Sequence, residues 1–80
     1  MNSKDVVKAW VANPAGVFYS GGALHTERNI VLSYAMIIAR CKDGKYYFRK
    51  RGPSMTTNKH LGMVRRAIPA NLMVEVDDCD

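Results

Sequence analysis

The chain has 80 residues and a formal net charge of +5; 48% of its residues are hydrophobic and 24% are charged. This composition excludes a disordered chain and predicts one small domain over residues 1–80, with little room for an enclosed active site. We therefore expect the function to reside on a binding surface, in a chain that folds alone or with a copy of itself.

Cysteine spacing and hydropathy restrict the expected setting. Cys41 and Cys79 lack CxxC spacing, and two thiols cannot build a disulfide framework. The longest nearly apolar run, residues 30–39, is about half the length that spans a bilayer. We expect a cytoplasmic protein in a reducing environment, without a membrane partner.

The first predicted element is a short helix over residues 3–11. Ser3 is a good N-cap, and Val6 and Trp10 share one face at i,i+4 spacing. Pro14 ends the helix, because the residue before a proline is pushed out of helical dihedrals. Trp10 is expected to pack in the core rather than to anchor a partner.

A short strand and a polar segment follow. Residues 17–20 predict a strand, Gly21-Gly22 a turn, and residues 25–29 a loop or an edge-strand extension. His25 and His60 show no zinc spacing with the two cysteines, so we predict no metal site and no cofactor.

Residues 29–51 carry the strongest pattern in the chain. Two runs rich in β-branched and aromatic residues flank Asp43-Gly44, which predicts a hairpin. A two-residue turn pairs Ala39 with Phe48 and gives one face a basic and aromatic stripe of Arg40, Tyr47, Arg49 and Arg51. A three-residue loop pairs Ile38 with Phe48 instead and breaks up that stripe. Both registers are compatible with the sequence.

A second helix is predicted after Gly52-Pro53. Thr56 or Thr57 is expected to cap it, and its apolar face, formed by Leu61, Val64 and Ile68, is expected to lie across the sheet. His60 should satisfy hydrogen bonds at the border of that face, and residues 72–76 should add an edge strand. The predicted class is α+β: a small antiparallel sheet built on the 29–51 hairpin and packed against one or two short helices.

The charges are segregated along the chain. Residues 41–66 hold eight basic side chains against Asp43 alone, and residues 77–80 form an acidic tail that is expected to be flexible. Aromatic residues interleaved with arginines on a sheet are how single-stranded nucleic acid is held. We predict nucleic-acid binding by a basic hairpin-helix surface, with Tyr47 as a stacking residue and with Arg49, Lys50, Arg51, Lys59, Arg65 and Arg66 as the cations.

Catalysis is not predicted. Nucleophile candidates are present in Cys41, Ser54, Thr56 and Thr57, with His60 as a base, but no carboxylate is placed to orient that base. The run Thr-Thr-x-Lys-His is better explained as a capped helix start, which gives Thr56, Thr57 and His60 structural roles.

Several short segments carry a resemblance to a known family. They are Ser33-Tyr34, Ile38-Ala39, Asp43-Gly44-Lys45, Ser54, Thr56-Thr57, Lys59-His60 and Arg65-Arg66. This pattern resembles that of an uncharacterised family of small proteins from bacteriophages and archaeal viruses, in which a glycine usually follows the Ser-Tyr pair. The resemblance implies a virus-encoded protein that acts inside an infected cell, and it implies no established activity. The alternative function is that of a viral accessory protein, whose basic patch binds an acidic surface of a host protein and which modulates that protein.

Overall fold

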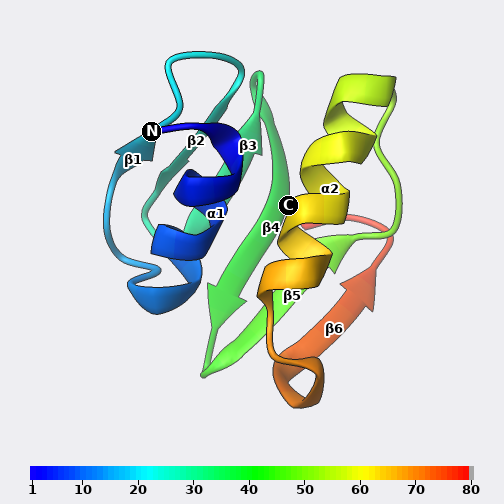
Figure 1. Ribbon diagram of the computed structural model, residues 1–80. Helices are drawn as coiled ribbons and strands as arrows, with labels where there is room; N and C mark the ends of the chain where they lie inside the picture. The colour runs from blue at the N-terminus through cyan, green and yellow to red at the C-terminus, as the bar shows by residue number, and fades with distance from the viewer. Residues whose placement is uncertain (80) are drawn as a thin grey trace.

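The computed structural model describes residues 1–79 and contains one six-stranded sheet with two α-helices. Both helices lie side by side on one face of the sheet, and the other face carries no helix (Figure 1). The predicted α+β class is therefore confirmed. In chain order the elements are α1 (Ser3–Ala12), β1 (Phe18–Tyr19), β2 (Leu24–Glu27), β3 (Ile30–Ser33), β4 (Met36–Lys42), β5 (Lys45–Arg49), α2 (Met55–Ala67), the 3-10 helix η1 (Ala70–Leu72) and β6 (Met73–Val76).

The strands cross the sheet in their chain order, from β1 at one edge to β6 at the other. All neighbours from β1 to β5 are antiparallel, whereas β6 runs parallel to β5 because α2 carries the chain back over the helix-covered face. The edge strand that the sequence predicted for residues 72–76 is confirmed as β6.

The turn between β4 and β5 has two residues. Lys42 pairs with Lys45 and Ala39 with Phe48, and the intervening Asp43 and Gly44 have φ of 54° and 79°. Positive φ at both central positions is the signature of a type I′ turn, which matches the twist of the flanking strands. Of the two registers considered from the sequence, the structure has the one that aligns Arg40 with Tyr47.

The segment before this turn differs from the expected single strand. Residues 30–42 form two strands, β3 and β4, joined by a tight turn at Tyr34-Ala35 in which Tyr34 has φ of 59°. Hydrophobic pattern alone missed the turn, because tyrosine and alanine are not turn residues and the apolar run continues through them. Residues 24–27 are likewise an inner strand, β2, rather than a loop or an edge extension.

The cap of each helix lies earlier than predicted, by one residue in α1 and by two or three residues in α2. The side chain of Asn2, not Ser3, accepts a hydrogen bond from the Asp5 amide at 2.8 Å and caps α1. Ser54, not Thr56 or Thr57, caps α2 by accepting from the Thr57 amide at 3.2 Å. A cap residue has an extended backbone and therefore precedes the first helical residue.

The core lies between the helices and the sheet. Trp10 is fully buried and meets the ring of Tyr46 edge to face, with 5.2 Å between the ring centroids. The hydroxyl of Tyr46 donates to the carbonyl of Val11 at 2.6 Å, which joins α1 to β5. The expected packing role of Trp10 is confirmed. The predicted apolar face of α2 is also in the core, since Leu61, Val64 and Ile68 are all buried.

Strand alternation then separates the side chains of the hairpin. Tyr46 and Phe48 belong to the core cluster under the helices. Tyr47, Arg49 and the paired Arg40 consequently project from the opposite, helix-free face of the sheet.

Candidate functional site

A cluster of polar side chains joins the start of α2 to the end of β3. The Oγ of Ser33 lies 3.2 Å from Thr57 Oγ1 and 2.8 Å from His60 Nδ1, and Ser54 Oγ donates to Thr57 Oγ1 at 3.1 Å. We call Ser33, Ser54, Thr57 and His60 the hydroxyl-histidine cluster. Burial lowers the pKa of His60 from its ordinary value, so its imidazole is neutral at pH 7.

The distance between Ser33 Oγ and His60 Nδ1 is that of a nucleophile and its base, but Ser33 is closed off from solvent. Ser33 is 1% exposed, its Oγ is shared with Thr57, and within residues 1–79 no carboxylate is hydrogen-bonded to His60. Among the other nucleophile candidates, Thr56 is exposed, while burial raises the pKa of the Cys41 thiol, which disfavours its reactive thiolate. The cluster is an attachment of α2 to the sheet.

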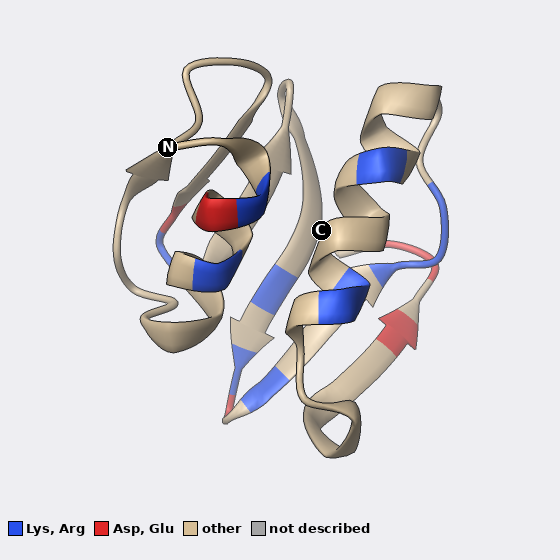
Figure 2. Ribbon diagram, viewed as in Figure 1, with Lys and Arg blue, Asp and Glu red and all other residues tan. Residues whose placement is uncertain are grey.

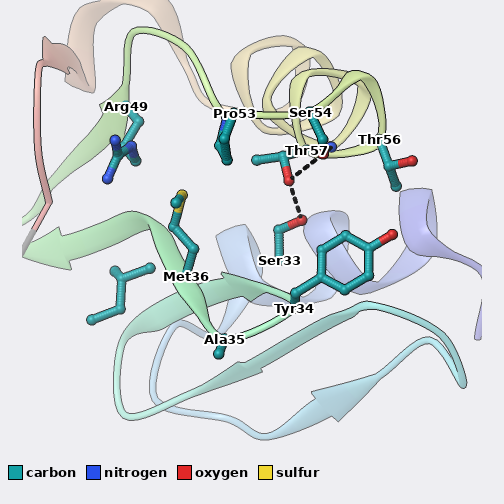
Figure 3. A pocket seen from close by; sticks show the side chains of 10 residues that line it. Ser33, Tyr34, Ala35, Met36, Arg49, Pro53, Ser54, Thr56 and Thr57 are labelled. Atoms are coloured by element: carbon teal, nitrogen blue, oxygen red, sulfur yellow. Dashed lines mark hydrogen bonds between the residues drawn. The ribbon is translucent and has the colours of Figure 1, made fainter.

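A shallow hollow of about 710 Å³ lies beside this cluster. Figure 3 shows Ser33 and Thr57 turned toward each other, with Tyr34 at one end of the hollow and Arg49 at the other. Because the hydroxyls of Ser33, Ser54 and Thr57 bond to one another, the hollow offers mainly apolar walls.

The second place of interest is the open-face site, which we define as Arg40, Tyr47 and Arg49 on the helix-free face. A groove of about 650 Å³ lies beside Arg40 and Tyr47 and is also lined by Asp78 and Cys79 of the C-terminal segment. Arg49 does not line this groove; it lies at the end of β5, where it also borders the hollow beside α2. Arg40 Nε donates to the carbonyl of Cys79 at 3.1 Å, and Arg49 Nη1 lies 3.7 Å from Asp78 Oδ1. Cys79 is buried there, although residues 77–80 were expected to be flexible; Asp80 falls outside the described residues.

The third place is a groove between the two helices. Lys4 and Lys8 of α1 line it together with Met63 and Arg66 of α2. Met63 and Arg66 continue into a neighbouring hollow that also contains Lys59 and Gly62. We call the basic set Lys4, Lys8, Lys59 and Arg66 the two-helix groove, and Figure 2 shows basic residues on both helices.

Glycine shapes this groove. A Cβ on Gly62 would lie 3.4 Å from Arg66 Nη1, so the guanidinium folds back along α2 over the bare glycine backbone. All four basic side chains of the groove are exposed, and in the described part of the chain none of them forms an ion pair. Among the described residues no acidic side chain lines the groove, which therefore concentrates positive charge, although the exposed Asp5 lies between Lys4 and Lys8 in the sequence of α1.

The predicted hairpin-helix surface is not one continuous surface, because the sheet and α2 divide its residues. Tyr47 and Arg49 lie on the open face, while Lys59 and Arg66 lie in the two-helix groove. Lys50 and Arg51 are exposed in the loop after β5. Arg65 contacts Glu75 at 3.4 Å and lies over the Phe48 ring, 5.2 Å from its centroid.

Sequence reasoning missed Lys4 and Lys8. Their signal is present in the sequence, since residues four apart on a helix project from the same side, but it is weaker than that of the dense basic block at 41–66. That Lys4 and Lys8 line the same groove as Arg66 depends on how the two helices pack.

In comparisons with known proteins, no family model, no curated protein and no solved structure matches the chain. The resemblance to small viral proteins stays a prediction. Over residues 1–79 the structure has no helix long and apolar enough to cross a membrane, and no group of three or more metal-ligating side chains.

Proposed function

We propose that this protein is a non-enzymatic module that binds nucleic acid by its phosphate backbone in the two-helix groove. One observation carries the proposal: Lys4 and Lys8 of α1 and Arg66 of α2 line the same groove and lack carboxylate partners among the described residues. Under the resemblance stated above, the protein would do this inside an infected cell.

The chemistry of the groove suits a polyanion. Flexible lysines and a guanidinium contact phosphate oxygens without reading base sequence, and each neutralised phosphate releases condensed counterions. The apolar side chain of Met63 between these cations adds contact surface and no competing charge. Arg49 is less suited to this role, because Asp78 already lies beside it.

The test is fluorescence anisotropy with labelled DNA and RNA duplexes over a series of salt concentrations. Duplex probes keep their bases stacked, so the backbone is the main contact. The double variant K8E/R66E should weaken binding about tenfold or more at low salt and reduce the magnitude of the salt slope by about 2, one for each lost phosphate contact.

Lys50→Glu is the matched control, because Lys50 is equally exposed but lies in the loop between β5 and α2. A combined K45E/K50E variant changes the net charge as much as K8E/R66E does. The proposal fails if the two double variants weaken binding equally, or if the unsubstituted protein does not bind either duplex at low salt.

A further inference from the structure

The helix-free face of the sheet has the layout of a platform for single strands. Tyr47 lies beside Arg40 in the paired strands β4 and β5, with Arg49 two residues further along. Tyr19 stacks on His25 at the other edge, with ring centroids 5.4 Å apart and an angle of 7° between the rings. Since Leu24 and Thr26 are buried under the helices, His25 and its neighbour Tyr19 project from the helix-free face.

These two aromatic positions are separated by a span that suits an extended strand. β2 and β5 are three strand spacings apart, or about 15 Å. The paired arginine, Arg40, lies between them on β4. Rings that stack bases, with guanidinium groups between them for phosphates, are the usual composition of single-strand binding surfaces.

The protein's own C-terminal segment occupies the Tyr47 end of this platform. Its oxygens lie where phosphate oxygens would bind: the Asp78 carboxylate is beside Arg49, and the Cys79 carbonyl accepts from Arg40. The Sγ of Cys79 reaches the carbonyl of Ile38 at 3.5 Å and holds the segment down. A carboxylate and a carbonyl oxygen placed on two arginines thus resemble the phosphate oxygens of a nucleic-acid backbone in their chemistry.

We infer that the open-face site is a second binding site, specific for single-stranded nucleic acid, and that residues 77–79 cover it as an internal competitor. The inference does not rest on the two-helix groove, which lies on the opposite side of the sheet. A single strand displaces the segment, stacks a base on Tyr47 and places phosphates on Arg40 and Arg49.

The experiment compares Asp78→Asn with Asp77→Asn. Both variants change the net charge by the same amount, and both residues are exposed, but only Asp78 is paired with Arg49. In a Cys41→Ala background, the rate of Cys79 modification by a thiol reagent reports release of the segment. D78N should accelerate that rate about two- to fivefold over D77N, the range expected for loss of an exposed ion pair.

Binding is measured with a fluorescein-labelled oligothymidylate of about ten nucleotides. The affinity of D78N should exceed that of D77N about two- to fivefold, matching the thiol result. Adding Tyr47→Leu should remove this gain, whereas Tyr47→Phe should keep it, because phenylalanine still stacks. A DNA duplex should bind D78N and D77N equally, since its bases are not available to Tyr47.

The outcomes separate this inference from the proposed function. The ratio of the oligothymidylate affinities of D78N and D77N is measured both with the two-helix groove intact and in the K8E/R66E background. The ratio can therefore still be determined if the groove does not bind nucleic acid. Faster Cys79 modification with equal oligothymidylate affinities overturns the second site. Equal modification rates overturn the covering role of residues 77–79, and a gain that survives Tyr47→Leu overturns stacking on Tyr47.

Discussion

Ser33 Oγ and His60 Nδ1 lie 2.8 Å apart, although the two residues are 27 positions apart in the chain. Ser33 ends β3, and His60 lies in the second turn of α2, so this hydrogen bond attaches the helix to the sheet. Thr57 makes a second bond to the same Oγ. The Ser-Tyr and Thr-Thr-x-Lys-His segments, which stood out in the sequence, therefore meet in a single structural contact.

The neutral His60 makes stability depend on pH. Burial lowers its pKa in the folded state below the unfolded value of about 6.5, so the unfolded chain binds a proton more readily. The contribution is fully present above pH 6.5 and is lost as the pH falls below that value. We expect the free energy of unfolding, measured in urea from pH 8 to pH 5.5, to decrease toward the acid end.

His60→Asn keeps a polar atom near the Nδ1 position and has no titrating ring, so it should flatten this decrease. Thr56→Asn, at an exposed position of the same helix and without a titratable group, is the control and should leave the decrease unchanged. An equal pH profile for His60→Asn and the unsubstituted protein would contradict the assignment to His60.

The hydroxyls near α2 should differ in their contributions to stability. Ser33→Ala leaves the buried Nδ1 of His60 without its hydrogen-bond partner, while Thr57 keeps its bond to Ser54, and should lower the free energy of unfolding by about 1–3 kcal/mol. Ser54→Ala removes a helix cap and should cost about 1 kcal/mol. The exposed Thr56 should tolerate alanine within about 0.5 kcal/mol. Denaturant unfolding of the three variants gives the order, and a Thr56 variant as destabilised as Ser33→Ala would contradict it.

The turn at Tyr34 stores backbone strain that glycine would relieve. Tyr34 has φ of 59°, a left-handed conformation that favours glycine, and the residue is 60% exposed. We expect Tyr34→Gly to raise the free energy of unfolding by about 0.5–1 kcal/mol. Ala35→Gly, at the next position with ordinary φ, should instead lower it. Thermal unfolding of both variants measures the change in the free energy of unfolding, which should be positive for Tyr34→Gly and negative for Ala35→Gly.

Two glycines, Gly52 before α2 and Gly62 within it, should change the free energy of unfolding in opposite directions when replaced by alanine. A Cβ on Gly52 would collide with Cγ2 of the buried Thr57, so Gly52→Ala should cost about 1–3 kcal/mol of unfolding free energy. Gly62 lies inside α2, where its nearest neighbour is the movable guanidinium of Arg66, so Gly62→Ala should stabilise the helix by about 0.5–1 kcal/mol. Urea titrations of the two variants measure both changes in the free energy of unfolding. Destabilisation by Gly62→Ala would show that the Arg66 side chain cannot move aside.

Much of the architecture was predictable because it depends on local chemistry. Asp43-Gly44 specifies a two-residue turn, and the i, i+3, i+7 spacing of Leu61, Val64 and Ile68 specifies a helix face. The turn at Tyr34-Ala35 was not predictable, since its positive φ is imposed on residues that do not favour it. The pairing of Ser33 with His60 was missed because neither residue predicts a partner so distant in the chain.

The positions of the candidate sites likewise depend on contacts between residues that are distant in the chain. The sequence by itself determined the fold class, the central hairpin and the basic character of the protein, because periodicity and turn residues act over a few positions. Only the tertiary structure decided which cations share a surface. Strand alternation directs Arg49 away from the helices, helix packing joins Lys8 to Arg66, and the chain's return along β6 lays Asp78 against Arg49.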